Sequence, residues 1–234
     1  MPLTYPMLMP EVGALAIDFG MPERVDYTSP ENSGRIGGVQ SGWPHFTLSL
    51  DLNNLPEPDA RVWRSFVRSL RGAQRRFLAW DPWRRYPIAH SGGFSRMTYA
   101  DGSAFSGAAG GWSQSITGNG DALLTLTGVP KGIRLTADDY IGLKWDADGS
   151  EPGTYDRRLM AVAQEDGVAD ADGSITVTVE PPLPDWTPAG AVAHLDQPCC
   201  LMKQRTGETK IGRRMLPDHI EAGSKFVAVQ ELLP

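Results

Sequence analysis

The chain has 234 residues, of which 41% are hydrophobic, and it contains seven tryptophans. This length and composition predict one large or two moderate folded domains and exclude a mainly disordered chain. No apolar run approaches the roughly 18 residues that a membrane helix needs, and the N-terminus lacks the basic start and apolar core of a secretory signal. We therefore expect a protein that is made in the cytoplasm and does not insert into a membrane.

The net charge of −6 is unevenly distributed along the sequence. Residues 57–90 carry eight arginines and three carboxylates, a net charge of +5, whereas residues 91–200 carry six basic and fifteen acidic residues, a net charge of −9. The flanking segments carry −4 over residues 1–56 and +2 over residues 201–234. The middle of the chain therefore differs electrostatically from the segment before it.

The two cysteines, Cys199 and Cys200, are adjacent. A disulfide between neighbours would close a strained ring, and a zinc site needs further ligands at regular spacings. We expect both thiols to be small apolar strand residues without a redox role, with side chains on opposite faces of the strand.

The first half of the chain predicts strands around one helix. Residues 1–40 are rich in proline and glycine and allow only short strands, whereas residues 45–52 alternate between apolar and polar side chains like a half-buried strand. Prolines and acidic residues open a helix at residues 56–59, and Gly72 ends it after Arg71. Its apolar stripe consists of Val62, Trp63, Phe66, Val67 and Leu70. A strand at residues 76–80 follows and stops at a turn.

The second half predicts short strands only. Residues 91–120 are dominated by glycine, serine and alanine and predict either short irregular strands or a long excursion. Beyond them, short apolar runs predict strands at residues 123–126, 140–145, 157–163 and 174–180. Their spacing indicates a small β-barrel or sandwich within residues 95–195. The chain then ends with strands at residues 200–202, 210–211 and 226–232.

A stripe of arginines is the strongest polar feature, at alternating spacings of three and four: Arg61, Arg64, Arg68, Arg71 and Arg75. These spacings place the arginines along one helix face if the helix runs that far. The face is either solvated or a contact surface for a neighbouring subunit or nucleic acid. Specific DNA binding is disfavoured, because no second helix follows and the overall charge is negative. The opposite charges of residues 57–90 and 91–200 favour head-to-tail packing of identical subunits.

Motifs for catalysis and metal binding do not emerge from the sequence. The glycine-rich stretch at residues 36–42 is not followed by the Gly-Lys-Ser/Thr of a phosphate loop, and the four histidines accompany neither a nucleophile elbow nor a His-Glu-x-x-His helix. Acidic loops starting at Asp146 and Asp170 lack the glycine and glutamate of an EF-hand. The acidic pairs 138–139 and 165–166 predict solvated turns. We expect no catalytic residue, no metal and no cofactor.

The order of the motifs carries a family resemblance from about residue 51 onward. A strand ending at residues 55–56 precedes a helix that contains Trp63, Phe66 and Leu70-Arg71-Gly72. Then come a Phe77-Leu78 strand with its Asp81-Pro82 turn, a glycine-rich segment, a Leu-x-x-Gly-Asp-Tyr-Ile-like pattern at 135–143, an Asp172-Gly173 hairpin, a strand at 175–182 and an apolar strand with Glu231. In this order the sequence resembles the distal tail proteins of long non-contractile-tailed phages and related prophages. Asp138 stands where the family pattern has glycine, so we expect that turn to differ.

The resemblance implies a mainly β fold in two parts. Residues 1–92 and 196–234 would form a tail-tube-like β-sandwich with one packed α-helix, and residues 93–195 an inserted small β-barrel or sandwich. Six copies would form a ring at the tail tip of the virion, with DNA passing through the lumen without specific binding. The ring would join the tail tube protein to the hub or tip proteins and to receptor-binding or fibre proteins.

An alternative function is a glycan- or receptor-binding tail-tip module. Four aromatic residues of the second half could stack on sugars, or else belong to the core: Trp112, Trp145, Tyr155 and Trp186. A hydrolase of cell-wall polysaccharide is disfavoured, because the sequence shows no catalytic constellation.

Overall fold

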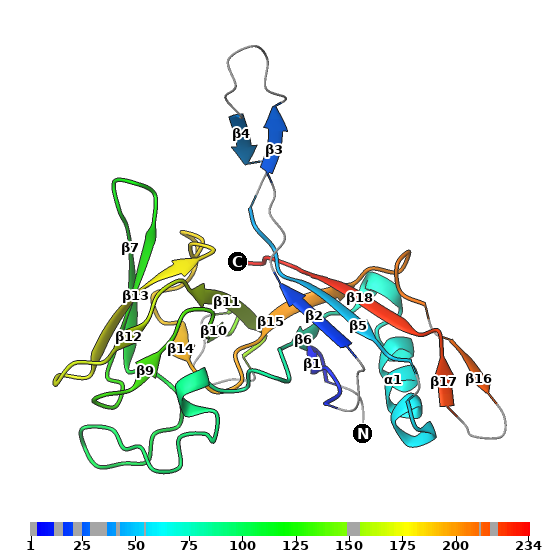
Figure 1. Cartoon of the computed structure of the whole chain (residues 1–234), viewed down its shortest axis with the longest axis horizontal. Helices are drawn as coiled ribbons and strands as arrows, with labels where there is room; N and C mark the ends of the chain where they lie inside the picture. The colour runs from blue at the N-terminus through cyan, green and yellow to red at the C-terminus, as the bar shows by residue number, and fades with distance from the viewer. Residues whose placement is uncertain are drawn as a thin grey trace.

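The computed structural model describes residues 4–11, 16–20, 25–28, 37–40, 43–53, 55–148, 155–210, 212–215 and 220–234. The prediction of a mainly β protein is confirmed, since 38% of the residues lie in strands and 10% in helices. Two six-stranded sheets lie next to each other along the long axis of the molecule (Figure 1). Within the described ranges, no helix has the length and apolar character to cross a membrane.

The first sheet, called the helix-bearing sheet, combines strands from both ends of the sequence. In spatial order these are β1 (Met7–Leu8), β6 (Phe77–Ala79), β15 (Cys200–Gln204), β18 (Lys225–Gln230), β5 (Thr47–Asp51) and β2 (Ala16–Gly20). β1 runs parallel to β6, and the other pairs are antiparallel. The predicted alternation in β5 is confirmed, because Leu48 and Leu50 are buried while Thr47 and Ser49 are partly exposed.

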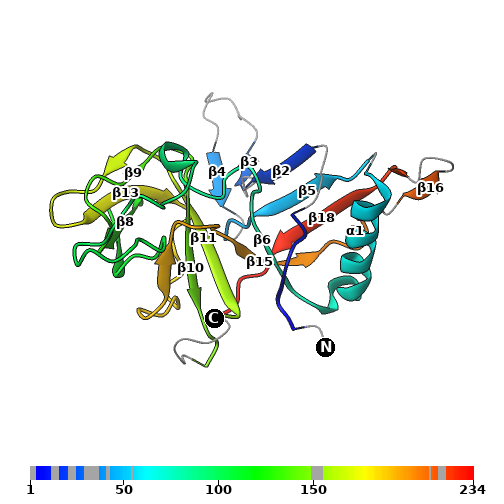
Figure 2. The same cartoon turned by 90° about the horizontal axis from the view of Figure 1, so that it is seen from below.

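One helix, α1 (Glu57–Ser69), lies against this sheet (Figure 2), and its aromatic residues contact those of the strands. The ring centroid of Phe66 lies 5.3 Å from that of Phe77 in β6 and 6.0 Å from that of Phe226 in β18. Trp63 lies 5.7 Å from the same Phe226 ring. Large apolar side chains of the helix and the sheet therefore share one buried core.

The predicted helix is confirmed, but its end and one of its faces differ from the prediction. The chain leaves the helix at Ser69, because Arg71 adopts a left-handed conformation with a φ of 50°. Val62, predicted for the apolar stripe, is 45% exposed and points away from the core. It lies between the cationic face and the buried face of the helix.

The second sheet consists of six antiparallel strands from the middle of the sequence. In spatial order they are β14 (Val192–His194), β10 (Tyr140–Trp145), β11 (Arg157–Ala163), β13 (Ser174–Glu180), β8 (Ala122–Thr127) and β7 (Gly111–Ile116). The strands predicted at residues 123–126, 140–145, 157–163 and 174–180 are thereby confirmed.

Hydrogen bonds between the edges close this second sheet into a barrel. Ala108, just before β7, forms a β-bridge with His194 of β14. The Ala109 amide donates to the Ala193 carbonyl at 2.8 Å, and the Leu195 amide donates to the Gly107 carbonyl at 2.8 Å. The middle of the chain therefore forms a small closed barrel, one of the two architectures predicted for it.

Three smaller pairs of strands complete the fold. β9 (Arg134–Leu135) pairs with β12 (Gly167–Val168) beside the barrel, and β16 (Arg213–Met215) pairs with β17 (Ile220–Ala222) near α1. β3 (Val25–Thr28) pairs with β4 (Gly37–Gln40) in a ribbon that joins neither six-stranded sheet and stands away from both (Figure 1). Of the predicted strand at 210–211, Lys210 forms a bridge with Lys225 and Ile211 lies outside the described residues.

The two sheets are in direct contact. Tyr140 of β10 and Met160 of β11 are buried in the same apolar cluster as the core of the helix-bearing sheet. The strands of that sheet lie before residue 80 and after residue 199, and those of the barrel lie between residues 111 and 194. Independent folding of residues 93–195 stays a prediction.

Candidate assembly surfaces

The outer face of α1 carries the arginines that can contact another molecule. Arg61 and Arg68 are exposed, and they line a shallow hollow of about 570 Å³ together with Arg64 and Ser65. Arg61 also forms an ion pair with Glu57, one turn earlier. Arg64 is half-buried. Its stem also lines a small apolar pocket under the helix, so it is less available than the other two.

An apolar hollow of about 490 Å³ adjoins this cationic face. Met7, Leu8, Pro10, Val62 and Phe66 form its apolar lining, and Arg61 lies at its rim. Leu8 is 41% exposed and Val62 is 45% exposed, which is unusual for side chains of this size. An apolar centre next to cationic side chains is the composition of many protein–protein interfaces.

Two of the five predicted interface arginines do not belong to this face. Arg71 follows the end of α1 in a left-handed conformation. Arg75 turns inward: its Nη1 donates to the Tyr5 hydroxyl at 2.7 Å and to the Ser69 carbonyl at 3.0 Å, and its guanidinium lies 4.4 Å from the centre of the Tyr5 ring. The sequence placed the five arginines on one face only if the helix ran that far; α1 ends at Ser69, so Arg71 and Arg75 lie beyond it, and the interface role of the arginines stays a prediction.

The four aromatic residues predicted to stack on sugars do not present four open faces. Trp145 is only 5% exposed and packs against Trp186, with ring centroids 6.1 Å apart. Trp112 is partly buried and donates its indole N–H to the Ala191 carbonyl at 2.7 Å. The Tyr155 ring lies beside two cationic side chains. Only Trp186, at 38% exposed, keeps a substantial open surface.

The barrel has a groove, lined by polar and apolar residues, that sequence analysis missed. It has a volume of about 900 Å³ and lies between the loop at residues 96–103, the end of β8 and the turn between β12 and β13. Asp101, Lys131 and Asp172 are among its charged lining residues. Loops that distant parts of the sequence bring together form this groove, so no local motif could reveal it.

Trp83 is a second feature that sequence analysis missed. Its side chain is 82% exposed, on the turn that follows β6, although tryptophan is usually largely buried. The nearby Ile88 is also 52% exposed. The signal in the sequence was a tryptophan set between the Asp81-Pro82 turn and two arginines, where no apolar periodicity predicts a core position.

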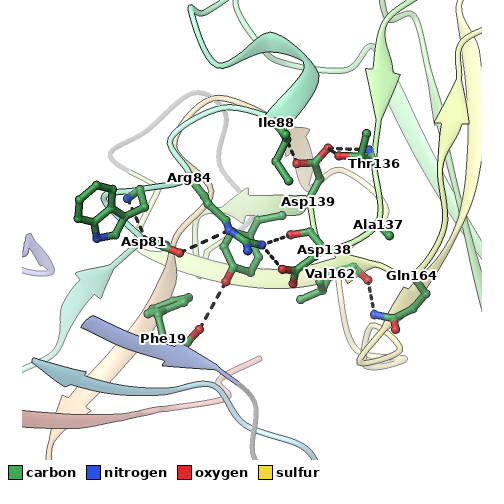
Figure 3. Close-up of polar contacts among 12 residues, drawn as sticks. Phe19, Asp81, Arg84, Ile88, Thr136, Ala137, Asp138, Asp139, Val162 and Gln164 are labelled. Carbon is green, nitrogen blue, oxygen red and sulfur yellow. Dashed lines mark hydrogen bonds and ion pairs between the residues drawn. The ribbon is translucent and has the colours of Figure 1, made fainter. Parts of the chain in front are cut away.

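A polar network holds the linker at residues 80–90 against the barrel (Figure 3). Arg84 Nη1 lies 2.5 Å from Asp138 Oδ2 and donates to the Asp138 carbonyl at 2.6 Å. Asp81 accepts the Trp83 amide at 2.9 Å, and burial raises the pKa of its carboxyl above the usual value. The Tyr140 hydroxyl donates to the Phe19 carbonyl at 3.4 Å across the two sheets. Burial raises the pKa of Tyr140 to about 12.

The prediction of a solvated turn at residues 138–139 is wrong for Asp139, which is buried. It is only 1% exposed, and its carboxylate accepts the Thr136 amide at 2.6 Å, the Thr136 hydroxyl at 2.9 Å and the Ile88 amide at 2.8 Å. This carboxylate therefore links the linker to the start of β10. Asp138, Glu165 and Asp166 are exposed, as predicted.

The described residues do not bring together a cluster of metal-ligating side chains. In the ranges that the structure covers, no group of three or more His, Cys, Asp or Glu side chains converges in the way that a metal requires. Cys199 and Cys200 are both buried as free thiols, and burial raises the pKa of each.

Comparisons with known proteins do not add a family assignment. No protein-family model matches the sequence, and no curated protein matches it either.

Proposed function

We propose that this chain is a structural subunit of a phage-like tail tip, which assembles with copies of itself into a ring. The ring, with six copies, would join the tail tube to the hub and receptor-binding proteins and let DNA pass through its lumen. The observation that carries this proposal is the two-stranded β3–β4 ribbon, which pairs with neither six-stranded sheet and stands away from both (Figure 1). An isolated two-stranded ribbon is marginally stable in water, so a partner surface would stabilise it.

The outer face of α1 also supports this proposal. α1 lies toward one end of the long axis, and β9, β12 and β13 lie toward the other (Figures 1 and 2). The far end exposes Val168 and the acidic residues Glu165, Asp166, Asp170 and Asp172. A surface at one end that complements a surface at the other gives head-to-tail contacts, which close into a ring when the rotation between subunits permits.

Native mass spectrometry and negative-stain electron microscopy of the full-length protein test the proposal. We expect a closed ring, with a mass that is an integer multiple of the 25.4 kDa chain. A monomer at every concentration, also when the protein is mixed with the tail tubes of the same particle, would contradict assembly.

A double charge reversal, R61E with R68E, tests the α1 face within this proposal. We expect the ring to dissociate while the melting temperature stays close to that of the unchanged protein, because both side chains are exposed. R96E, an exposed arginine in the barrel loop, is the matched control and should leave the ring intact. If the double variant still forms rings, the ring uses another surface.

Glycan binding by the barrel is a second candidate function, and the groove with its mixed polar and apolar lining favours it. A groove with carboxylates, a lysine and open backbone offers hydrogen bonds to a polyhydroxylated ligand. A glycan array on the full-length protein tests this function, with D101N and D172N together as the variant. Unchanged binding in this double variant would exclude the groove as the site.

A further inference from the structure

Two basic side chains lie directly opposite each other in the barrel. Lys144 of β10 and Arg158 of β11 are partners in the antiparallel register, so both point to the same face of the sheet. Tyr140 and Met160 share this face by alternation, and both are buried against the helix-bearing sheet. Like charges directly opposite each other destabilise a sheet. The pair therefore needs a compensating interaction at the junction.

The neighbouring groups offset these charges only in part. Lys144 Nζ lies 4.8 Å and Arg158 Cζ lies 5.4 Å from the centre of the Tyr155 ring, so both cations use the same aromatic ring. Asp196 is a carboxylate that acts on Lys144, and its Oδ1, which lies 3.6 Å from Arg85 Nε, is itself buried without a hydrogen-bond donor. Lys144 also has a lowered pKa, because of burial and the nearby Arg158.

Arg158 of this pair has buried N–H groups without a hydrogen-bond acceptor. Arg158 approaches the Cys199 thiol, but its Nε and Nη1 atoms are buried without an acceptor. A buried donor without an acceptor costs about 1–3 kcal/mol, and more when it is charged. An acceptor that binds at the junction would remove this cost.

His194 adds a buried hydrogen-bond acceptor that has no donor. It lies on β14 opposite Gly142, two residues from Lys144, and is therefore on the same face. Its side chain is 5% exposed, and its Nδ1 lies 2.9 Å from the Asp196 carbonyl. Because that carbonyl can only accept, Nδ1 carries the proton and Nε2 is an acceptor. Nε2 is buried and has no donor.

We propose that Lys144, Arg158 and His194, called the basic cluster, bind one hydrogen phosphate ion at the junction between the barrel and the helix-bearing sheet. The ion's oxygens accept hydrogen bonds from Lys144 and Arg158, and its hydroxyl donates to His194 Nε2. Water could satisfy the same atoms, but it would not neutralise two cations. Sulfate would neutralise the cations, but it has no proton to donate at neutral pH. The chemistry of the cluster therefore favours phosphate over sulfate.

The ion would connect four segments that meet at the junction. It would bind β10, β11 and β14 directly, and through the Asp196 carbonyl and Cys199 it would reach the segment that enters β15. This site is separate from the α1 face and from the groove, and it does not depend on ring assembly. The phosphate site can exist in a protein that forms no ring, and a ring can form without the phosphate site.

Thermal unfolding of the full-length protein in chloride, sulfate and inorganic phosphate at matched ionic strength and pH 7 tests the site. We expect the melting temperature to rise with phosphate in a saturable way and to rise less with sulfate. R158M and K144M should each weaken phosphate binding by about tenfold or more in calorimetric titration, since each removes a charge-assisted hydrogen bond. In chloride alone both variants should be at least as stable as the unchanged protein, because the like-charge pair is gone.

R157M is the matched control. Arg157 is the preceding residue of β11, its side chain points to the other face, and it pairs with Asp156 at 2.7 Å. This variant should keep the phosphate response. Equal effects of sulfate and phosphate, or an unchanged phosphate response in both R158M and K144M, would overturn the proposal. Loss of the response in R157M as well would show a general charge effect and would also overturn it.

Discussion

Arg84 holds Asp138 at two points, since its guanidinium pairs with the Asp138 carboxylate and donates to the carbonyl of the same residue (Figure 3). Asp138 has a φ of 75°, a left-handed conformation that glycine adopts without strain and other residues adopt at a cost. The motif that this segment resembles has glycine at the same position. The backbone is therefore one that glycine would permit, and the contacts with Arg84 help aspartate to adopt it.

Substitutions at Asp138 separate the backbone conformation from the ion pair. D138A loses the carboxylate and keeps a side chain at positive φ, which costs about 1–2 kcal/mol for the conformation alone. D138G loses the same carboxylate but adopts the conformation freely. We expect D138G to unfold at a higher urea concentration than D138A. The opposite order would show that the strain at Asp138 is negligible.

Gly142 is expected to tolerate no side chain. A Cβ atom there would lie 2.5 Å from His194 Nε2, closer than any real contact, and the imidazole is buried and cannot move aside freely. We expect G142A to destabilise the protein by about 1–3 kcal/mol in urea unfolding, the usual cost of overpacking. G118A is the control, because nothing lies within 4 Å of the added atom. Equal stability of the two variants would show that the junction can expand.

Arg75 and Arg68 should behave differently, although the sequence places both in one stripe. Arg75 hydrogen-bonds the Tyr5 hydroxyl and the last turn of α1, whereas Arg68 is exposed on the outer face. We expect R75M to lose about 1–2 kcal/mol of unfolding free energy, since it removes charge-assisted hydrogen bonds. R68M should stay within about 0.5 kcal/mol of the unchanged protein. Similar losses in both variants would contradict the division of the stripe.

The sequence predicted the elements whose pattern is local. Strict alternation identified β5 and β13, and the spacing of Trp63 and Phe66 identified α1, because one face of each element is buried and the other is not. The barrel followed from several short strands separated by turns. These predictions needed only neighbouring residues.

The remaining features depend on contacts between distant residues. The burial of Asp139 follows from its hydrogen bond to the Ile88 amide, 51 residues away, and the inward turn of Arg75 follows from Tyr5, 70 residues away. The closure of the barrel through Ala108 and His194 is equally non-local. Periodicity contains no information about such pairs, so the groove and the basic cluster could not be predicted.

His194 should make the fold sensitive to acid. Burial, together with the nearby Lys144 and Arg158, lowers the pKa of His194 to about 3, from 6.5 in an exposed histidine. The folded protein disfavours protonation of the buried imidazole, whereas the unfolded chain accepts the proton near pH 6.5. His194 therefore does not reduce the stability of the fold above about pH 6.5, and stability is lost as the pH falls from there toward 3. The loss is up to about 1.4 kcal/mol per pH unit in this window. Asp81 acts in the opposite direction, since burial raises its pKa, so the comparison must be between variants.

H194Q isolates this contribution, because glutamine retains hydrogen-bonding groups but does not titrate. Urea unfolding in phosphate-free buffers between pH 7 and pH 4.5 should give a steeper decline for the unchanged protein than for H194Q. H90Q serves as the comparison: burial also lowers the pKa of His90, but this side chain is more exposed than His194, so its effect on the slope should be smaller. Parallel curves for the unchanged protein and H194Q would show that His194 reaches water before the protein unfolds.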